Sequence, residues 1–335
     1  MDVLAVEGLK VDYRTPRGAI HAVDGASFTV GAGQVVGLVG ESGCGKTTVA
    51  RAVTGVYPRN ASIVGGKIRF LGQDLLALDA AAYRALRWRG FAFVPQSAMN
   101  SLDPVYRVGD QLAEVLTERG GLGAADAARR ASELFELVGL SPTRLVDYPH
   151  QFSGGMRQRA AIALALALNP KLVIADEPVT ALDVIIQRQV LDVIRELQRR
   201  LGLSMILVTH DISVVAYVCD RVVVMYAGQV VESGSAAAVL ARPFHPYTMG
   251  LNNAFPDLQS SAGLLVPIEG APPDLAAPPG GCRFAPRCPF VQERCRAECP
   301  PLVPLAEGQS SACWRATEAE TLRAKSRDPK TWLRS

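Results

Sequence analysis

The sequence predicts an α/β fold, a largely parallel sheet flanked by helices. Apolar runs of strand length alternate with longer stretches of helical period, and this alternation builds such a sheet. The strand-like runs are 34–39, 172–175 and 204–209, and the helical stretches include 124–137 and 184–201. We expect this pattern to continue to about Glu232, with a largely helical subdomain inserted at about 73–169.

Proline marks a second region. Fourteen of the 22 prolines lie from Pro243 onward, where helical periodicity fades. We therefore predict a main domain over 1–242 and a small Pro- and Cys-rich C-terminal domain over 243–335. The chain shows no internal repeat of roughly 20 to 50 residues, so we expect one catalytic domain.

Composition disfavours several classes of function. The chain has 35 basic and 32 acidic residues, a balance that argues against a nucleic-acid partner. Its first residues carry acid where a secretory signal carries positive charge. The longest apolar run, 160–168, is far shorter than the roughly 20 residues of a membrane-spanning helix. We expect a chain that is not exported and does not cross the membrane.

A glycine-rich loop follows the strand at 34–39. Its residues are Gly40, Glu41, Ser42, Gly43, Cys44, Gly45, Lys46, Thr47 and Thr48, and a helix is predicted to begin within it. Glycines let consecutive backbone N–H groups face phosphate oxygens, and the helix N-terminus adds partial positive charge. Lys46 is then placed to reach the β- and γ-phosphates and Thr47 to ligate Mg²⁺. The alternative, a simple glycine-rich turn, is disfavoured by the acidic residues described next.

The strand at 172–175 leads into Asp176 and Glu177. Parallel sheets bind ligands beyond the carboxyl ends of their strands, where these two acids are expected to lie. Asp176 is suited to hold Mg²⁺, and Glu177 to act as general base on the attacking water. By itself such a strand is more often followed by an ordinary turn, but the phosphate loop makes the pair its expected partner.

The segment Phe152-Ser153-Gly154-Gly155-Met156-Arg157-Gln158-Arg159 resembles the signature motif of ATP-binding cassette (ABC) proteins. It opens a predicted helix over 156–168 and thus offers a second phosphate cradle, which in the family serves the ATP held by the other protomer. In isolation, Ser153 would be read as a simple helix cap. Met156 departs from the Gln found in many members of the family.

Further residues match the family in order. Gln96 resembles the loop residue that senses Mg²⁺ and contacts the membrane subunit, and Asp183 the loop that crosses the dimer interface. His210 resembles the switch histidine that touches the γ-phosphate, and Tyr13 is similar to the aromatic residue that stacks on adenine. The resemblance covers roughly residues 3 to 232. It implies ATP and Mg²⁺ as ligands, with Lys46, Gln96, Glu177 and His210 as the catalytic residues.

Several phrases are similar to the ATPase subunits of dipeptide, oligopeptide and nickel importers. They are 96–104, 156–159, 180–187 and 244–248. This resemblance implies a peripheral protein at the cytoplasmic face of the inner membrane that powers peptide import. Its expected partners are a second homologous ATPase subunit in a heterodimer, two membrane permease subunits and an extracytoplasmic solute-binding protein. Nickel or another small solute stays open as cargo, and a non-transport ABC ATPase or a regulatory nucleotide-binding subunit is the rival of another class.

The tail carries Cys282, Cys288, Cys295, Cys299 and Cys313. Without an export signal, such a cluster indicates a metal site before it indicates disulfides, although structural thiols are the alternative. Four thiolates at one point can ligate zinc or an iron-sulfur cluster. The family resemblance favours Cys282, Cys288, Cys295 and Cys313 as ligands of a [4Fe-4S] cluster, with zinc as second choice and Cys299 as an extra thiol.

Overall fold

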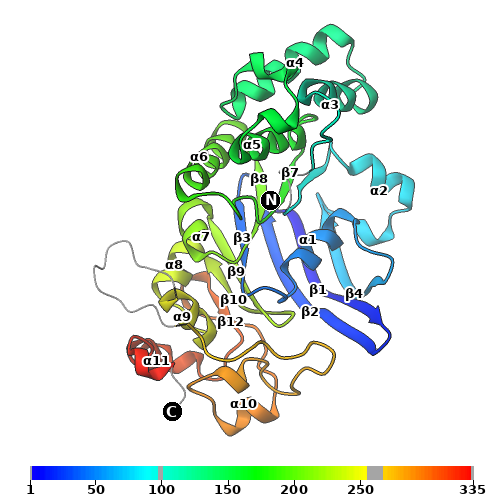
Figure 1. Ribbon diagram of the computed structural model, residues 1–335. Helices are drawn as coiled ribbons and strands as arrows, with labels where there is room; N and C mark the ends of the chain where they lie inside the picture. Colours follow the sequence, from blue (N-terminus) through cyan, green and yellow to red (C-terminus); the bar gives the residue numbers. More distant parts are fainter. Residues whose placement is uncertain (1, 97–100, 255–266, 333–335) are drawn as a thin grey trace. The chain divides into compact units, whose positions relative to one another are not determined.

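A computed structural model describes residues 2–96, 101–254 and 267–332, and the chain divides into two units. Unit 1 contains Met1–Leu4, Val30–Val35 and Phe70–Val208, and unit 2 contains Ala5–Thr29, Val36–Arg69 and Thr209–Ser335. Figure 1 shows both units, with labels on many of their elements. Part of the importer-like phrase 96–104, residues 97–100, lies outside the described residues.

Strands β6 (Phe91–Val94), β7 (Leu172–Asp176) and β8 (Ser204–Thr209) form a parallel ladder in unit 1. Phe91 is paired with Leu172, and Leu172 with Ser204, so the three carboxyl ends lie at one edge. Every residue of β7 and β8 is buried, as expected for strands covered on both faces. The predicted strand at 204–209 is confirmed to the residue.

The helices of unit 1 include two whose bounds match the prediction, α4 and α6. The elements are β5 (Gln73–Asp74), α2 (Ala80–Leu86), α3 (Val108–Glu114), a π-helical turn (Val115–Arg119), α4 (Ala124–Leu137), α5 (Gly154–Ala165) and α6 (Val184–Leu201), with short 3₁₀ turns at Leu75–Ala77, Pro142–Val146 and Pro149–Gln151. Helix α5 differs from the prediction of 156–168, because Ser153 caps it and places both glycines inside its first turn. Strand β6 lies within the range expected to be largely helical.

Unit 2 contains a mixed sheet that the C-terminal segment joins. Strand β3 (Val35–Val39) runs parallel to β9 (Arg221–Tyr226), which pairs antiparallel with β10 (Gln229–Ser235). The short strand β12 (Ser310–Ser311) then pairs with β10, and β11 (Val303–Pro304) with β12. The described part of 243–335 therefore shares a sheet with earlier strands. The predicted domain boundary at 242 stays a prediction.

The other elements of unit 2 are mostly short. In a separate sheet, β1 (Asp2–Thr15) lies between β2 (Gly18–Gly31) and β4 (Ala61–Phe70). The helices are α1 (Lys46–Thr54), α7 (Ile212–Val218), α8 (Ala236–Ala241), α9 (Pro246–Asn253), α10 (Glu293–Ala297) and α11 (Ala319–Ser326), with 3₁₀ turns at Ala285–Arg287, Ala306–Gly308, Ala316–Glu318 and Pro329–Thr331.

An aromatic cluster joins the tail to the core of unit 2. The ring centroids of Tyr226 and Tyr247 are 4.6 Å apart, and that of Phe284 lies 5.2 Å and 5.4 Å from them. All three side chains are essentially buried. Aromatic rings at these distances add to the free energy of burial. The segment around Phe284 is thus anchored on strand β9 and helix α9.

Candidate functional site

The loop between β3 and α1 belongs to unit 2 and has the backbone of an anion cradle. Gly45 directly precedes α1 with a φ of 102°, which residues with a side chain rarely adopt. A Cβ atom on Gly45 would collide with the carbonyl oxygen of Ala22, and one on Gly40 with that of Met225. The loop is packed so closely against neighbouring backbone that glycine is required at both positions.

Lys46 lies under this loop with only 4% of its surface exposed. Its Nζ donates hydrogen bonds to the carbonyl oxygens of Gly40, at 2.6 Å, and Glu41, at 2.9 Å. The thiol of Cys44 is 3.6 Å from Nζ, and burial raises the pKa of this thiol, so that it is neutral. The ammonium group is therefore the positive charge of the loop, held where a phosphate oxygen can replace a carbonyl as acceptor.

Unit 2 also holds the predicted residues Tyr13, Thr47 and His210. The hydroxyl of Tyr13 lies 3.3 Å from Oγ1 of Thr48, which brings its half-buried ring beside the start of α1. Thr47 is half-buried in the first turn of α1. His210 is exposed and directly follows β8. The position of Tyr13 fits its predicted contact with adenine, which stays a prediction.

In unit 1, the structure brings together Glu177 and Gln96. Oε2 of Glu177 accepts hydrogen bonds from Nε2 of Gln96, at 2.8 Å, and from Oγ1 of Thr180, at 3.0 Å. Glu177 has a φ of 48°, and its N–H donates to the carbonyl oxygen of Val208 at 2.8 Å. A side-chain-bearing residue in this left-handed region is uncommon, and such strain concentrates at functional sites. The preceding Asp176 ends β7 and is 2% exposed.

The two loops that are predicted to lie at a dimer interface are also in unit 1. Ser153 caps α5, and its Oγ accepts from the N–H of Met156 at 3.3 Å. Asp183 caps α6 in the same way through the N–H of Ile186, at 3.0 Å. A Cβ atom on Gly155 would collide with Ile186, so α5 approaches the start of α6 closely.

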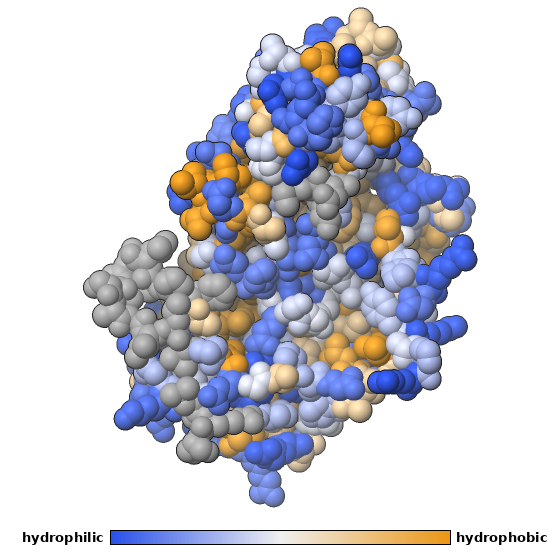
Figure 2. All heavy atoms as spheres, in the orientation of Figure 1, coloured by the Kyte–Doolittle hydropathy of each residue, from blue (hydrophilic) through white to orange (hydrophobic). Residues whose placement is uncertain are grey.

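An exposed apolar surface follows the cap of α6. Val184 and Ile185 begin this helix with 81% and 72% of their surfaces exposed. Figure 2 shows the corresponding apolar area over α6. Contiguous exposed apolar area is a feature of surfaces that contact partners.

The predicted nucleotide residues thus form two groups. Unit 2 holds Tyr13, the loop Gly40–Thr48 and His210, whereas unit 1 holds Gln96, Ser153, Gly154, Gly155, Asp176, Glu177 and Asp183. Within their groups, Tyr13 lies at Thr48 and Gln96 lies at Glu177. Sequence reasoning missed Thr180, which follows Glu177 by three positions and orients its carboxylate.

Sequence reasoning also missed a contact between the phosphate loop and the tail. Nη1 of Arg287 lies 2.7 Å from Oε2 of Glu41, and the side chain of Arg287 is only 4% exposed. Burial alone would lower the pKa of Arg287, but its hydrogen bonds to Glu41 and to the Tyr226 hydroxyl raise it. The available signal was an arginine directly next to a cysteine in a Pro-rich tail.

Four cysteines of the tail line one cavity. Cys282, Cys288, Cys295 and Cys313 face it together with apolar residues, and the exposed Cys299 is not among its lining residues. Burial raises the pKa of the Cys282 thiol to about 11 and that of Cys313 to about 12, and neighbouring thiols contribute. Among the described residues, no group of three or more His, Cys, Asp or Glu side chains is arranged to hold a metal ion. The four thiols therefore share a cavity, but these described side chains are not arranged as the ligands of a metal ion.

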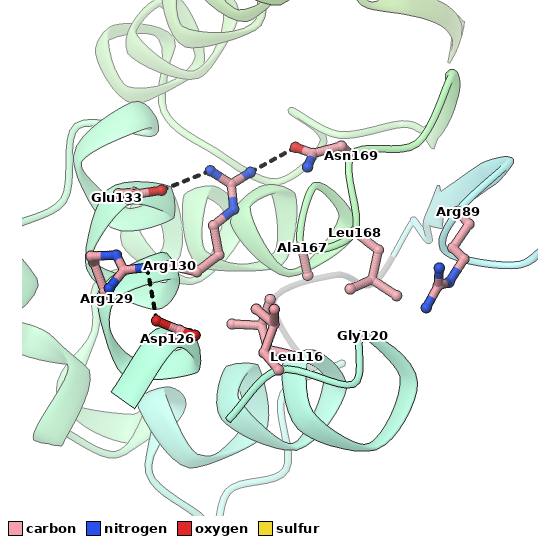
Figure 3. A pocket seen from close by; sticks show the side chains of 11 residues that line it. Arg89, Leu116, Gly120, Asp126, Arg129, Arg130, Glu133, Ala167, Leu168 and Asn169 are labelled. Atoms are coloured by element: carbon pink, nitrogen blue, oxygen red, sulfur yellow. Dashed lines mark hydrogen bonds and ion pairs between the residues drawn. The ribbon is translucent and has the colours of Figure 1, made fainter. Parts of the chain in front are cut away.

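A second hollow lies among the helices of unit 1 and is drawn in Figure 3. It has a volume of about 400 Å³ and is bordered by α4, the π-helical turn and the residues that follow α5. Arg129 pairs with Asp126 across 2.8 Å, and Arg130 contacts both Glu133 and Asn169. None of the predicted nucleotide residues lines it.

The described helices also bear on the membrane question. In the ranges 2–96, 101–254 and 267–332, no helix has the length and apolar character needed to cross a membrane.

Two sequence profiles match the chain. The profile described as ABC transporter matches residues 23–180, and the one described as oligopeptide/dipeptide transporter, C-terminal region, matches residues 231–295.

Full-length relatives agree with these matches. The chain is 43% identical to a probable peptide ABC transporter ATP-binding protein of Sinorhizobium fredii, over 96% of this chain and 97% of that protein. It is also 43% identical to an oligopeptide transport ATP-binding protein of Salmonella typhimurium, over 94% of each chain. A solved ATP-binding cassette, a dimer in a post-hydrolysis state with ADP and phosphate, superposes with a TM-score of 0.62 at 25% identity. That match covers 70% of this chain and 98% of the cassette.

Proposed function

The chain belongs to the ABC transporter family, and we propose that it is the ATP-hydrolysing subunit that powers peptide import through a membrane transporter. The observation that carries this proposal is the joint presence of the ABC profile and the peptide-transporter C-terminal profile in one chain. The relatives named for peptide transport match over nearly their whole length. Peptide as cargo rests on these names.

The residues of both units suit the hydrolysis of ATP. The glycine cradle and Lys46 bind the phosphates, and Glu177 accepts the proton of the attacking water as general base. Gln96 and Thr180 hold the Glu177 carboxylate by hydrogen bonds, which fixes its orientation. His210 is the expected contact of the γ-phosphate.

Magnesium fits the side chains assigned to it. Mg²⁺ prefers oxygen ligands, and Thr47, Gln96 and Asp176 offer a hydroxyl, an amide and a carboxylate oxygen. When bound, the ion neutralises charge that develops on the phosphates. The buried position of Asp176 at the end of β7 is consistent with this role.

The working assembly is proposed as a heterodimer with a second homologous ATPase subunit. Each ATP then touches the phosphate loop of one subunit and the signature serine, here Ser153, of the other. The exposed Val184 and Ile185 beside Asp183 support such a partner face. Closure that is favoured only with ATP bound shifts the dimer's population and moves the membrane subunits.

The assembly also needs membrane and extracytoplasmic components. We assign the chain to the cytoplasmic face of the inner membrane, beneath two permease subunits that receive peptides from a solute-binding protein. The hollow in Figure 3 is the proposed contact for a permease, since it lies among the helices of unit 1 and is not lined by nucleotide residues.

The cysteine cavity suits a [4Fe-4S] cluster held by Cys282, Cys288, Cys295 and Cys313, with zinc as second choice. Its support is that these four thiols share one cavity from which Cys299 is absent. Bound iron or zinc favours thiolates and lowers the pKa that burial raises. Anaerobic purification with iron and sulfide analysis and EPR tests the proposal. A colourless protein that contains neither iron nor sulfide would refute the cluster, and bound zinc would identify the second choice.

Transport by the assembled complex tests the main proposal. Vesicles containing the transporter are expected to accumulate a labelled dipeptide or oligopeptide when ATP is supplied on the cytoplasmic side. Lys46→Ala should abolish both nucleotide binding and uptake, because the loop loses its positive charge. Uptake of nickel but of no peptide would show that nickel, and not peptide, is the cargo. ATP hydrolysis without association with any membrane protein would overturn the transporter role.

A further inference from the structure

The segment that links two of the tail cysteines contacts the phosphate loop. This segment is Cys282-Arg283-Phe284-Ala285-Pro286-Arg287-Cys288, and its 3₁₀ turn (Ala285–Arg287) ends at Arg287. We propose that Arg287 is a positioning residue of the nucleotide site, acting through Glu41 to fix the phosphate loop for Mg²⁺-ATP. The inference rests on the proposed ATPase function and assigns it a residue far outside the family's nucleotide motifs.

Glu41 is held at three points. Its carboxylate pairs with Arg287 across 2.7 Å, and its backbone N–H donates to the hydroxyl of Tyr247 at 2.8 Å. Its carbonyl oxygen accepts from Nζ of Lys46 at 2.9 Å. A change in the orientation of Glu41 therefore changes the position of the lysine that binds phosphate.

Arg287 is itself fixed, so its contact with Glu41 is well defined. Its Nε donates to the carbonyl oxygen of Glu269 at 3.0 Å, and Nη2 donates to that of Ile268 at 2.9 Å. Nη1 also lies 3.2 Å from the hydroxyl of Tyr226. A buried guanidinium with this many acceptors loses little further freedom when it binds a carboxylate. The ion pair is therefore rigid on both sides.

A second arginine of the same segment is connected to another part of the loop through intermediate residues. Arg283 donates through Nη2 to Oδ2 of Asp24, at 2.6 Å, and through Nη1 to the carbonyl oxygen of Ala227. The next residue, Gly228, donates its N–H to the carbonyl oxygen of Cys44 at 3.0 Å. Two independent routes thus lead from the cysteine-bearing segment to the loop, and Arg287 provides the direct one.

A double-mutant cycle on the full-length chain tests the proposal. The variants are Arg287→Met, Glu41→Gln and their combination, and the probe is a fluorescent ATP analogue with Mg²⁺. We expect each single change to raise the dissociation constant by about 5- to 10-fold and the double change to raise it no further. Arg294→Met is the matched control, because Arg294 lies in the same tail but pairs on the surface with Glu298. This control should stay within about twofold of the unchanged chain.

The cycle separates positioning from a loss of folding. If Arg287 only stabilised the fold, Arg287→Met would weaken binding equally in the Glu41→Gln background, and this additive result would overturn the proposal. Unchanged binding in Arg287→Met would overturn it as well. Should Arg287→Met fail to fold, Glu41→Gln decides alone, since its half-buried side chain keeps its shape and an acceptor oxygen: unweakened binding refutes the proposal, and weakened binding supports it.

A separate variant tests the proposed ATPase function. Lys46→Ala should lose nucleotide binding whatever the role of Arg287. If Lys46→Ala binds the analogue as well as the unchanged chain, the ATPase function fails. If Lys46→Ala loses binding but the Arg287 and Glu41 variants bind the analogue as well as the unchanged chain, only the positioning role of Arg287 is refuted.

Discussion

Glu177→Gln is the sharpest test of the chemistry assigned to unit 1. Glutamine keeps the length of the side chain and one oxygen that can accept from Gln96 and Thr180, whose distances to Oε2 are 2.8 Å and 3.0 Å. Glutamine and glutamate have the same branching at Cβ, so the substitution adds no strain to the left-handed backbone at Glu177. We therefore expect the local structure to survive, whereas the ability to accept a proton is lost.

The magnitude follows from that loss. A positioned general base contributes about 100- to 10,000-fold to the rate, which corresponds to roughly 3 to 5 kcal/mol of activation free energy. ATP affinity should be equal or higher, because the proposed role puts the negative charge of Glu177 near the γ-phosphate and the substitution removes that charge. The variant should thus bind ATP normally and hydrolyse it at least about 100-fold more slowly.

The assay is single-turnover phosphate release by the assembled transporter, with the matching glutamate of the partner ATPase also replaced so that this chain's site dominates. Glu196→Gln is the control, since Glu196 forms an exposed pair with Arg199 on α6 and should leave the rate unchanged. Phosphate release by the Glu177 variant within about threefold of the unchanged chain would refute its role as general base.

Three further predictions concern other parts of the chain. Gly45→Ala should lose about 1 to 3 kcal/mol of unfolding free energy and weaken nucleotide binding, because alanine is strained at this φ and collides with Ala22; chemical denaturation measures it. Glu232→Gln should become more stable relative to the unchanged chain as pH rises from 4.5 to about 7. Burial raises the pKa of Glu232 from 4.5 to about 7, so the stability it contributes is complete below pH 4.5 and lost through pH 7; urea unfolding at pH 5 and 7.5 compares the two chains. Leu122→Asp, at the hollow of unit 1, should lower peptide-stimulated hydrolysis several-fold without changing the ATP affinity of the isolated chain, whereas Leu201→Asp at the end of α6 should not.

Strong periodicity made some helices predictable. Helices α4 and α6 have the predicted bounds, because both carry a long amphipathic pattern, and Gly202 ends α6 in the left-handed region. The start of α5 was harder to predict from the sequence, since Gly154 and Gly155 are poor helix formers that the Ser153 cap brings into the first turn. Strand β6 has only four residues, too short for its period to distinguish it from a helix.

The candidate site shows the same dependence on local pattern. The phosphate loop and the acidic strand end were predictable, because their residues are consecutive and their chemistry is read directly from the sequence. The contact of Gln96 with Glu177 crosses 81 positions, and that of Glu41 with Arg287 crosses 246. No periodicity links residues so far apart. Such contacts arise from strand order and from packing of the tail.

The tail has a physical reason to remain attached to the phosphate loop. Phe284 is buried against Tyr226 and Tyr247, and full burial of a large apolar side chain contributes roughly 1.5 to 3 kcal/mol. Removal of Arg287 takes the buried cation away from the partly buried carboxylate of Glu41, which is more costly than loss of a surface pair. Removal of Arg283 leaves Asp24 paired with the more exposed Lys10, at 3.0 Å. These contributions are large beside the 5 to 15 kcal/mol that typically stabilise a folded protein. The Pro- and Cys-rich tail therefore helps to stabilise unit 2, and the arginines that achieve this are the same ones that reach the phosphate loop.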